Sequence, residues 1–297
     1  MSMVEEELMP TKRIARIIVY IVAIWLTIGI IAMYAWLFVG SFSEDIYGLK
    51  PTRITLENWK FLKEPIIKPG SKTTYPSVWK ITFNTLYLAL ATTFVTVMVS
   101  SLGGYALSRL RFRWRGHILA LILILHAFPG IALLVALFYV INYLGLYGNI
   151  WSVVLSKSAL MIPLGVWVMK GFFDIVPWDI EMSALVDGLS RTRTFFQIML
   201  PLVRPGLAAL AILTFISAWG EYILVLVFLT ISEKSWTLAI FLQQLAYQAL
   251  TGEVSVAGIS RGMIIAVGLW YMLPIILFFI FTQKYLLQIT GGGVKGY

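Results

Sequence analysis

Long runs of residues without a charged side chain constrain the fold of this chain more than any other feature. Residues 17–39 and 81–108 carry no charge, and residues 118–156 form an uncharged run of 39. A helix crosses the roughly 30 Å hydrocarbon core of a bilayer with about 20 residues. Only 12% of the chain is charged, against about a quarter of a soluble domain. The sequence therefore predicts an all-α, polytopic membrane protein.

Counting these runs predicts six transmembrane helices with both termini on one side of the membrane. The 39-residue run is too long for one helix, and the turn-forming residues 145–149 divide it. Prolines are expected to interrupt three helices, at Pro129, Pro163 and Pro274. The six helices are expected at residues 17–39, 81–108, 118–144, 150–170, 206–230 and 262–283.

Basic residues at the ends of these runs orient the chain. Four arginines follow the second run within seven residues, at Arg109, Arg111, Arg113 and Arg115. Lysine and arginine beside membrane spans concentrate on the cytoplasmic side. We therefore expect a cytoplasmic N-terminus (1–16), a transmembrane domain (17–283) and a cytoplasmic C-terminal tail (284–297). Within the domain we expect outer loops at 40–78 and 231–260 and a cytoplasmic loop at 173–203; the sequence reveals no role for 40–78.

The composition excludes several classes of active site. With no cysteine the chain has no thiolate nucleophile and no cysteine-ligated metal site, and it has only two histidines. Residues 258–262 match the Gly-x-Ser-x-Gly elbow of hydrolases, but they open a membrane helix, whereas the elbow follows a strand. The net charge of +9 fits basic residues bordering membrane spans. We expect no catalytic residue, no metal ion, no cofactor bound by this chain and no nucleic-acid partner.

The cytoplasmic loop is expected to fold as two short helices. Asp179 is placed to cap the first helix after Pro177, and Gly188 to end it in the left-handed conformation. Ser190 is placed to cap the second helix, which should stop at Pro201. A helix-turn-helix held at the membrane surface by two spans is a rigid protrusion, although local physics alone also allows a plain amphipathic loop.

The order of residues in this loop resembles the EAA loop of ABC-importer permeases, which in that family docks into a cleft of the ATP-hydrolysing subunit. Where that family has Glu-Ala-Ala, this chain has Met182, Ser183 and Ala184, and the acid stands one place earlier. Which acid meets the ATPase is left open. The resemblance implies that ATPase coupling involves Glu181, Ser183, Ala184, Asp187, Gly188, Ile198, Leu200 and Pro201.

The resemblance extends over nearly the whole chain, to the smaller, MalG-like permease of maltose-type sugar importers. The matching stretches are residues 108–113, 127–130, 167–173, 215–222 and 292–296. This resemblance implies a type I ABC-importer permease fold in the cytoplasmic (inner) membrane, forming half of a pathway for maltose, maltodextrin or a similar oligosaccharide. In that family the C-terminal tail reaches between the ATPase subunits, which implicates Gly292, Val294 and Lys295.

The same resemblance implies several partners. They are a second permease subunit, two ATP-binding subunits, an extracytoplasmic sugar-binding protein that meets residues 231–260, and membrane lipid. ATP and magnesium are expected in the partner subunits, because residues 291–296 lack the spacing of a phosphate-binding loop. This chain is therefore not expected to be an enzyme. A secondary transporter is the alternative from another class, but its usual internal repeat is not found.

Two charged residues fall inside predicted spans. Lys157 is the eighth residue of the fourth span and Glu221 lies well inside the fifth, where an unpaired charge costs about 2.5–3.5 kcal/mol. They could pair with each other, Lys157 could bind substrate in the pathway, or each could be satisfied locally. Lys157 also leaves open an acidic sugar or sugar phosphate as substrate. Beside them, Trp219 is either a platform for a sugar ring or a packing residue.

Overall fold

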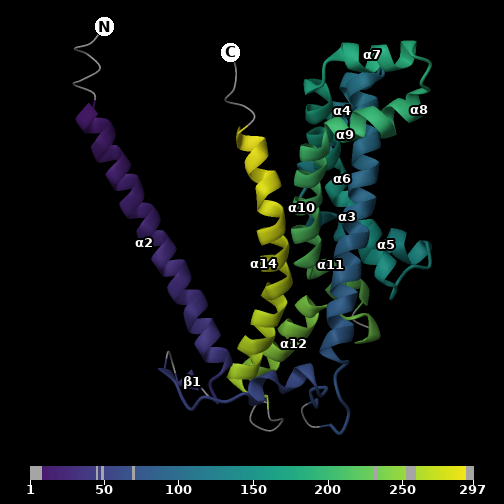
Figure 1. Cartoon of the computed structure of the whole chain (residues 1–297). Helices are drawn as coiled ribbons and strands as arrows, with labels where there is room; N and C mark the ends of the chain where they lie inside the picture. The colour runs from purple at the N-terminus through teal and green to yellow at the C-terminus, as the bar shows by residue number, and fades with distance from the viewer. Residues whose placement is uncertain are drawn as a thin grey trace.

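The computed structural model describes residues 9–44, 46–47, 50–68, 71–229, 233–251 and 259–291, most of them in helices. Within these residues, four helices are each long and apolar enough to cross a membrane. Two bent pairs of helices bring the number of crossings to six if each pair counts as one. The four are α2 (Met9–Ser41), α3 (Val78–Arg109), α6 (Ile150–Ile175) and α14 (Arg261–Gly291), labelled in Figure 1.

The third predicted span breaks where the sequence places its proline. Helix α4 (Arg115–His126) ends before Pro129, and the chain resumes as η2 (Gly130–Leu133) and α5 (Leu134–Tyr143) at an angle of 93°. The predicted turn before α6 is confirmed: Gly145 and Gly148 have φ of 68° and 80°. Asn149 accepts a hydrogen bond from the Trp151 amide and caps α6.

Two of the three expected proline breaks are wrong. Pro163 and Pro274 lie inside α6 and α14, which continue through them. A proline removes one backbone hydrogen bond, but α6 packs closely on α3, and α14 packs on α10. Tertiary packing therefore holds both helices together across the missing bond.

The fifth predicted span is not one helix, which corrects the expectation for residues 206–230. Helix α10 (Arg204–Trp219) ends at Gly220, and α11 (Ile223–Leu229) begins after Tyr222. The break coincides with the intramembrane Glu221. Its carboxylate satisfies a backbone amide that the broken helix leaves free.

The centre of the fold is the contact of α3 with α6 and α10. Glycine allows the close approach of α3 and α6: a Cβ at Gly104 would lie 2.8 Å from the backbone nitrogen of Lys170, and one at Gly165 would lie 2.2 Å from Ser100 Oγ. Apolar side chains fill the remaining space in two buried clusters, one toward each end of the helices.

The two ends of the molecule differ in construction. Figure 1 places the start of α2 and the end of α14 at the same end as α7 (Trp178–Val186) and α8 (Arg191–Thr194). The opposite end carries β1 (Ile46–Tyr47), β2 (Lys50–Pro51), η1 (Glu57–Leu62), η4 (Glu233–Ser235) and α12 (Leu238–Thr251). Because it carries the two predicted outer loops, we call this second end the outer cap.

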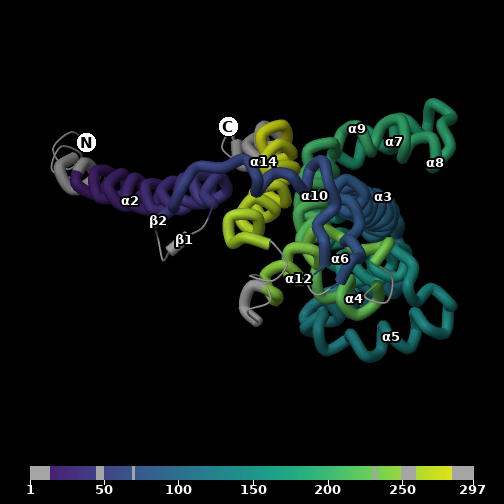
Figure 2. Tube along the Cα trace, turned by 90° about the horizontal axis from the view of Figure 1, so that it is seen from below, coloured from purple at the N-terminus to yellow at the C-terminus, as the bar shows by residue number. Residues whose placement is uncertain are grey.

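Helix α2 stands apart from the other spans. Figures 1 and 2 show it leaning away from the bundle, with α14 as its nearest neighbour, and it packs against α14. None of its most apolar window is buried within the chain. The helix therefore presents its apolar side chains to its surroundings along most of its length.

The outer cap contains the predicted outer loop at 40–78, whose role the sequence did not reveal. Asn58 on η1 donates hydrogen bonds to the carbonyls of Ser41 and Ser43 and accepts one from Ser260 Oγ. A Cβ on Gly262 would lie 2.3 Å from Ser43 O. The cap thus ties the end of α2 to the start of α14. Ser260, the serine of the hydrolase-like match, caps α14 through the Met263 amide.

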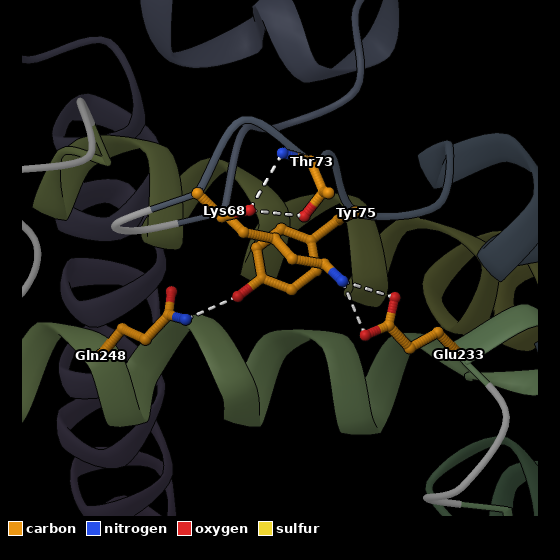
Figure 3. Close-up of polar contacts among 6 residues, drawn as sticks. Lys68, Thr73, Tyr75, Glu233 and Gln248 are labelled. Carbon is orange, nitrogen blue, oxygen red and sulfur yellow. Dashed lines mark hydrogen bonds and ion pairs between the residues drawn. The ribbon is translucent and has the colours of Figure 1, made fainter.

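A second set of polar contacts joins the two outer loops (Figure 3). Lys68 Nζ lies 2.7 Å from both carboxylate oxygens of Glu233, and Gln248 on α12 donates a hydrogen bond to the Tyr75 hydroxyl. Thr85 on α3 accepts a hydrogen bond from the Leu238 amide at the start of α12. These contacts hold α12 against the first outer loop.

Replacement of Tyr75 by phenylalanine should lower the stability of the outer cap by about 1 kcal/mol, the usual net value of one hydrogen bond. Burial raises the pKa of the Tyr75 hydroxyl above its ordinary value. Because burial disfavours the charged phenolate, the stability of the wild type should be unchanged by pH below the pKa of an unfolded tyrosine and should fall as the pH rises through the raised pKa. Thermal unfolding of wild type and Tyr75→Phe over an alkaline pH series checks this; parallel curves would contradict it.

Candidate functional site

The predicted cytoplasmic loop folds as a helical hairpin between α6 and α10. It consists of α7, the turn at Gly188 with φ of 88°, and α8, followed by the π-helical turn η3 (Phe195–Met199) and α9 (Leu200–Leu202). The left-handed Gly188 is confirmed, and so is the cap at Ser190, whose Oγ accepts from the Arg193 amide at 3.4 Å.

Two details of the predicted hairpin are wrong. Helix α7 begins directly after Pro177 and has no side-chain cap, so Asp179 lies in the first turn. A carboxylate there still interacts favourably with the positive end of the helix dipole. The second helical segment continues one residue past Pro201, to Leu202, since proline is tolerated in the first turn of α9.

The hairpin separates its predicted coupling residues into an inward and an outward set. Glu181 and Ala184 are buried, with exposed fractions of 1% and 5%. Ser183, Asp187 and Gly188 are exposed on the outward side. In the second half of the hairpin, Ile198, Leu200 and Pro201 are half-buried.

Glu181 is held by two residues of α3. The Tyr105 hydroxyl donates a hydrogen bond of 2.7 Å to Glu181 Oε1, and Arg109 Nε lies 3.4 Å from Oε2, an ion pair without hydrogen-bond geometry. The side chain of Arg109 is 4% exposed. Two charges in so dry a place interact strongly and are costly to leave unpaired.

Arg109 also reaches the end of α6. Its guanidinium donates hydrogen bonds to the carbonyls of Phe173 and Val176, at 2.6 and 2.5 Å. It lies 5.1 Å from the centre of the Trp178 ring on α7. One arginine therefore joins the ends of α3 and α6 to the first helix of the hairpin.

Sequence reasoning assigned no coupling role to Tyr105 or Arg109. In the sequence, Arg109 belongs to the basic cluster that orients the chain, and Tyr105 simply lies within the uncharged run at residues 81–108. A signal was available, because residues four apart lie on the same face of a helix. An arginine one turn after a tyrosine at the end of a span marks a polar face directed toward another segment.

An apolar cluster backs the hairpin from within. Phe195 and Met199 of η3 pack with Tyr105, Met169 and Phe173, and the rings of Tyr105 and Phe195 lie 4.9 Å apart. At the start of α10, a Cβ on Gly206 would lie 2.4 Å from the Phe172 ring. The hairpin is thus packed onto α3, α6 and α10.

The two charged residues predicted inside spans form an ion pair. Lys157 Nζ on α6 lies 2.6 Å from Glu221 Oε2, and their side chains are 16% and 9% exposed. Glu221 Oε1 accepts a hydrogen bond from the Leu224 amide and thereby caps α11. The pairing hypothesis is confirmed, and the pair fixes the break in the fifth span against α6.

Trp219 is a packing residue in this structure. Its side chain is 1% exposed, and its ring lies beside those of Phe215 and Tyr271, at 5.8 and 6.2 Å between centroids. Its indole N–H donates to the carbonyl of Tyr271. The predicted tail residues Gly292, Val294 and Lys295 lie outside the described residues.

Comparison with known proteins agrees with this architecture. The trehalose/maltose permease MalG of Thermococcus litoralis is 31% identical over 287 residues, covering 95% of this chain and 97% of the relative. The maltodextrin permease MalD of Streptococcus pneumoniae is 37% identical over 214 residues, covering 72% of this chain and 74% of the relative. The Escherichia coli inner membrane ABC transporter permease YcjP is 31% identical over 249 residues, 84% of this chain and 83% of the relative.

A solved structure has the same fold. It is a chain of a bacterial ABC transporter involved in the import of the acidic polysaccharide alginate, with a TM-score of 0.71 at 21% identity, covering 92% of this chain and 98% of that one. Residues 101–288 match the family of binding-protein-dependent transport system inner membrane components. These residues include the hairpin and the ion pair, and the chain belongs to that family.

Proposed function

We propose that this chain is one of two permease subunits of an ATP-driven importer of maltose, maltodextrin or a similar oligosaccharide. The substrates named for its relatives, trehalose/maltose and maltodextrin, support this class. The observation that carries the coupling role is the hairpin itself. It is packed firmly onto three spans, while the outward side of α7 is left exposed.

The hairpin transmits motion and performs no chemistry. A partner that pushes α7 displaces Arg109 and Glu181 together, and with them the ends of α3 and α6. Because both helices are tightly packed near Gly104 and Gly165, they tilt as one body. ATP and magnesium belong to two partner ATPase subunits in this scheme, and this chain forms half of the pathway.

The burial of Glu181 supports an ATPase contact that is made by other residues. We place the docking surface on the outward side of α7, with Asp179 and Asp187 as its acids. Ser183 and Gly188 lie on the same side, and Val186 is 85% exposed there. An apolar side chain so exposed on a loop outside the membrane is suited to burial against a partner. Ala184, Ile198, Leu200 and Pro201 support this surface from within.

Replacement of Val186 by aspartate is expected to weaken binding of the ATPase subunits at least about tenfold, because an unpaired carboxylate would be buried in the contact. The fold should be preserved, since Val186 makes little contact within the chain. Co-purification of the ATPase subunits measures the effect, and Ile54→Asp, which changes an exposed apolar residue of the outer cap, is the matched control. If the Val186→Asp variant recovers as much of the ATPase subunits as the wild type does, Val186 is not part of the docking surface.

The remaining partners are assigned by the exposed parts of the chain. We assign the surface of α2, whose most apolar window is not buried by any of the described residues, to the second permease subunit and to lipid. The outer cap, with α12 in residues 231–260, is assigned to the sugar-binding protein, which places both termini and the tail with Gly292, Val294 and Lys295 in the cytoplasm. Lys157, Trp219 and Glu221 stay proposed as residues that shape the pathway at the broken fifth span.

Purification and transport test this function. The chain should co-elute with a second permease and with ATPase subunits. In proteoliposomes, ATP hydrolysis by the complex should rise with a sugar-loaded binding protein. A panel of neutral and acidic oligosaccharides should show stimulation by neutral ones. A chain that purifies alone and transports on an ion gradient would contradict the proposal in favour of a secondary transporter.

A further inference from the structure

A groove with a volume of about 440 Å³ lies between α4 and α6, at the end of the molecule that carries the hairpin. Its floor is apolar, formed by Leu119, Trp167, Val168, Gly171, Phe172 and Ile175. Nothing lies within 4 Å of the place where a Cβ on Gly171 would be, so this glycine keeps the groove open. Trp167 and Ile175 are 50% and 78% exposed.

The rim of the groove is basic. Lys170 lies on the rim and is paired with Asp174 at 2.5 Å. Arg115 interacts electrostatically with Asp174, and it stands one turn before Leu119, on the same face of α4. The one carboxylate at the rim is therefore already occupied by Lys170, and the arginine adds positive charge.

Two more arginines stand beside Arg115, in the turn between α3 and α4. Arg111 lies 5.5 Å from the Trp178 ring centre, and Arg113 lies 5.9 Å from that of Trp114. Among the residues that the structure describes, none of these three arginines is within ion-pair distance of a carboxylate. The cluster therefore carries a net positive charge that can interact with an anionic ligand.

The groove lies at the level of the lipid headgroups. Helix α6 has 26 residues and is about 39 Å long, longer than the roughly 30 Å hydrocarbon core. Its last turns, which line the groove, therefore reach the headgroup region. Trp114 and Trp167 are exposed near this end of the spans, and tryptophan is usual at a membrane interface.

We infer that this groove binds one anionic phospholipid. An acyl chain would lie along the apolar floor at Trp167, Gly171 and Ile175, and the phosphate would face Arg113 and Arg115. Basic pockets between membrane helices on the cytoplasmic side suit such headgroups. Charge complementarity and the apolar floor both favour a lipid over the ATPase, whose docking surface lies on α7. The inference does not depend on which sugar the complex carries.

Native mass spectrometry of the assembled complex tests this inference, with phosphatidylglycerol or phosphatidylcholine added after delipidation in detergent. The wild type should retain one phosphatidylglycerol in preference to phosphatidylcholine. The double variant Arg113→Gln and Arg115→Gln should bind it about 30-fold more weakly, since each arginine contributes about fivefold at an anionic surface. Gly171→Leu should cause a similar loss by filling the groove while all charges remain.

A charge-matched control removes two lysines that are exposed in the outer cap, Lys63→Gln with Lys72→Gln, and it should retain the lipid as the wild type does. Equal retention of the two lipids by the wild type would overturn the inference. The inference would also be overturned if the arginine double variant and Gly171→Leu both bound phosphatidylglycerol as tightly as the wild type does. Loss of ATPase subunits from an arginine variant that still binds the lipid would assign the arginines to that partner and overturn it as well.

Discussion

Replacement of Glu181 by glutamine is expected to destabilise the assembled complex by about 3–5 kcal/mol and to abolish most sugar transport. Glutamine has nearly the same shape as glutamate and still accepts a hydrogen bond from Tyr105. The charge opposite Arg109, which is 4% exposed, is lost, and a buried charge without its partner has a cost of this size. Thermal unfolding of the complex and uptake by proteoliposomes measure the two effects.

Two further variants separate the charge of Glu181 from its hydrogen bond. Tyr105→Phe removes only the hydrogen bond of 2.7 Å and should cost about 2 kcal/mol, the usual value for a hydrogen bond to a charged group. Glu64→Gln, at an exposed acid of the outer loop, should change neither stability nor transport. A Glu181→Gln complex that assembles with wild-type stability and transports at the wild-type rate would show that the Arg109 contact does not hold the hairpin.

The hairpin shows which parts of a functional site can be predicted from sequence. Gly188 and Ser190 were predicted correctly because turn and cap preferences depend on residues a few positions apart. Asp179 was assigned to the wrong position by the same kind of reasoning, since Pro177 sets the start of α7. The contact between Arg109 and Glu181 spans 72 residues, and no local pattern reports it. The direction in which Glu181 points was therefore beyond prediction.

A double-mutant cycle on Lys157 and Glu221 is expected to show strong coupling. Lys157→Met and Glu221→Gln should each destabilise the complex by about 3–5 kcal/mol, because each leaves one partner charged in a largely buried place. The free energy lost in the double variant should be smaller, by about 1–3 kcal/mol, than the sum of the losses in the two single variants. Glutamine keeps a side-chain oxygen that can accept from Leu224 and cap α11.

Thermal unfolding of the four complexes gives the coupling energy, and additive losses would contradict a functional contact between the two side chains. Transport adds a second criterion. A Lys157→Met complex that assembles normally and transports at the wild-type rate would remove Lys157 from the pathway. Leu155→Met, at an exposed position of the same helix, is the control for adding a methionine.

The breaks within the spans could be predicted less completely than the positions of the spans along the sequence. The positions of the helices followed from the uncharged runs, and the first break followed from Pro129. Both can be read from continuous stretches of the sequence. The break in the fifth span was missed, since residues 206–230 are uncharged apart from one acid and contain no proline. It is Lys157 of another helix that stabilises the acid at the break. Conversely, α6 and α14 continue through their prolines because neighbouring helices support them.

The ion pair also has a consequence for how the chain is synthesised. Lys157 precedes Glu221 by 64 residues, so at about 5–20 residues per second the lysine leaves the ribosome several seconds before its partner exists. During that interval the unpaired charge costs about 2.5–3.5 kcal/mol in the membrane. We therefore expect α6 to be less stably inserted before α10 and α11 arrive than after they have joined it.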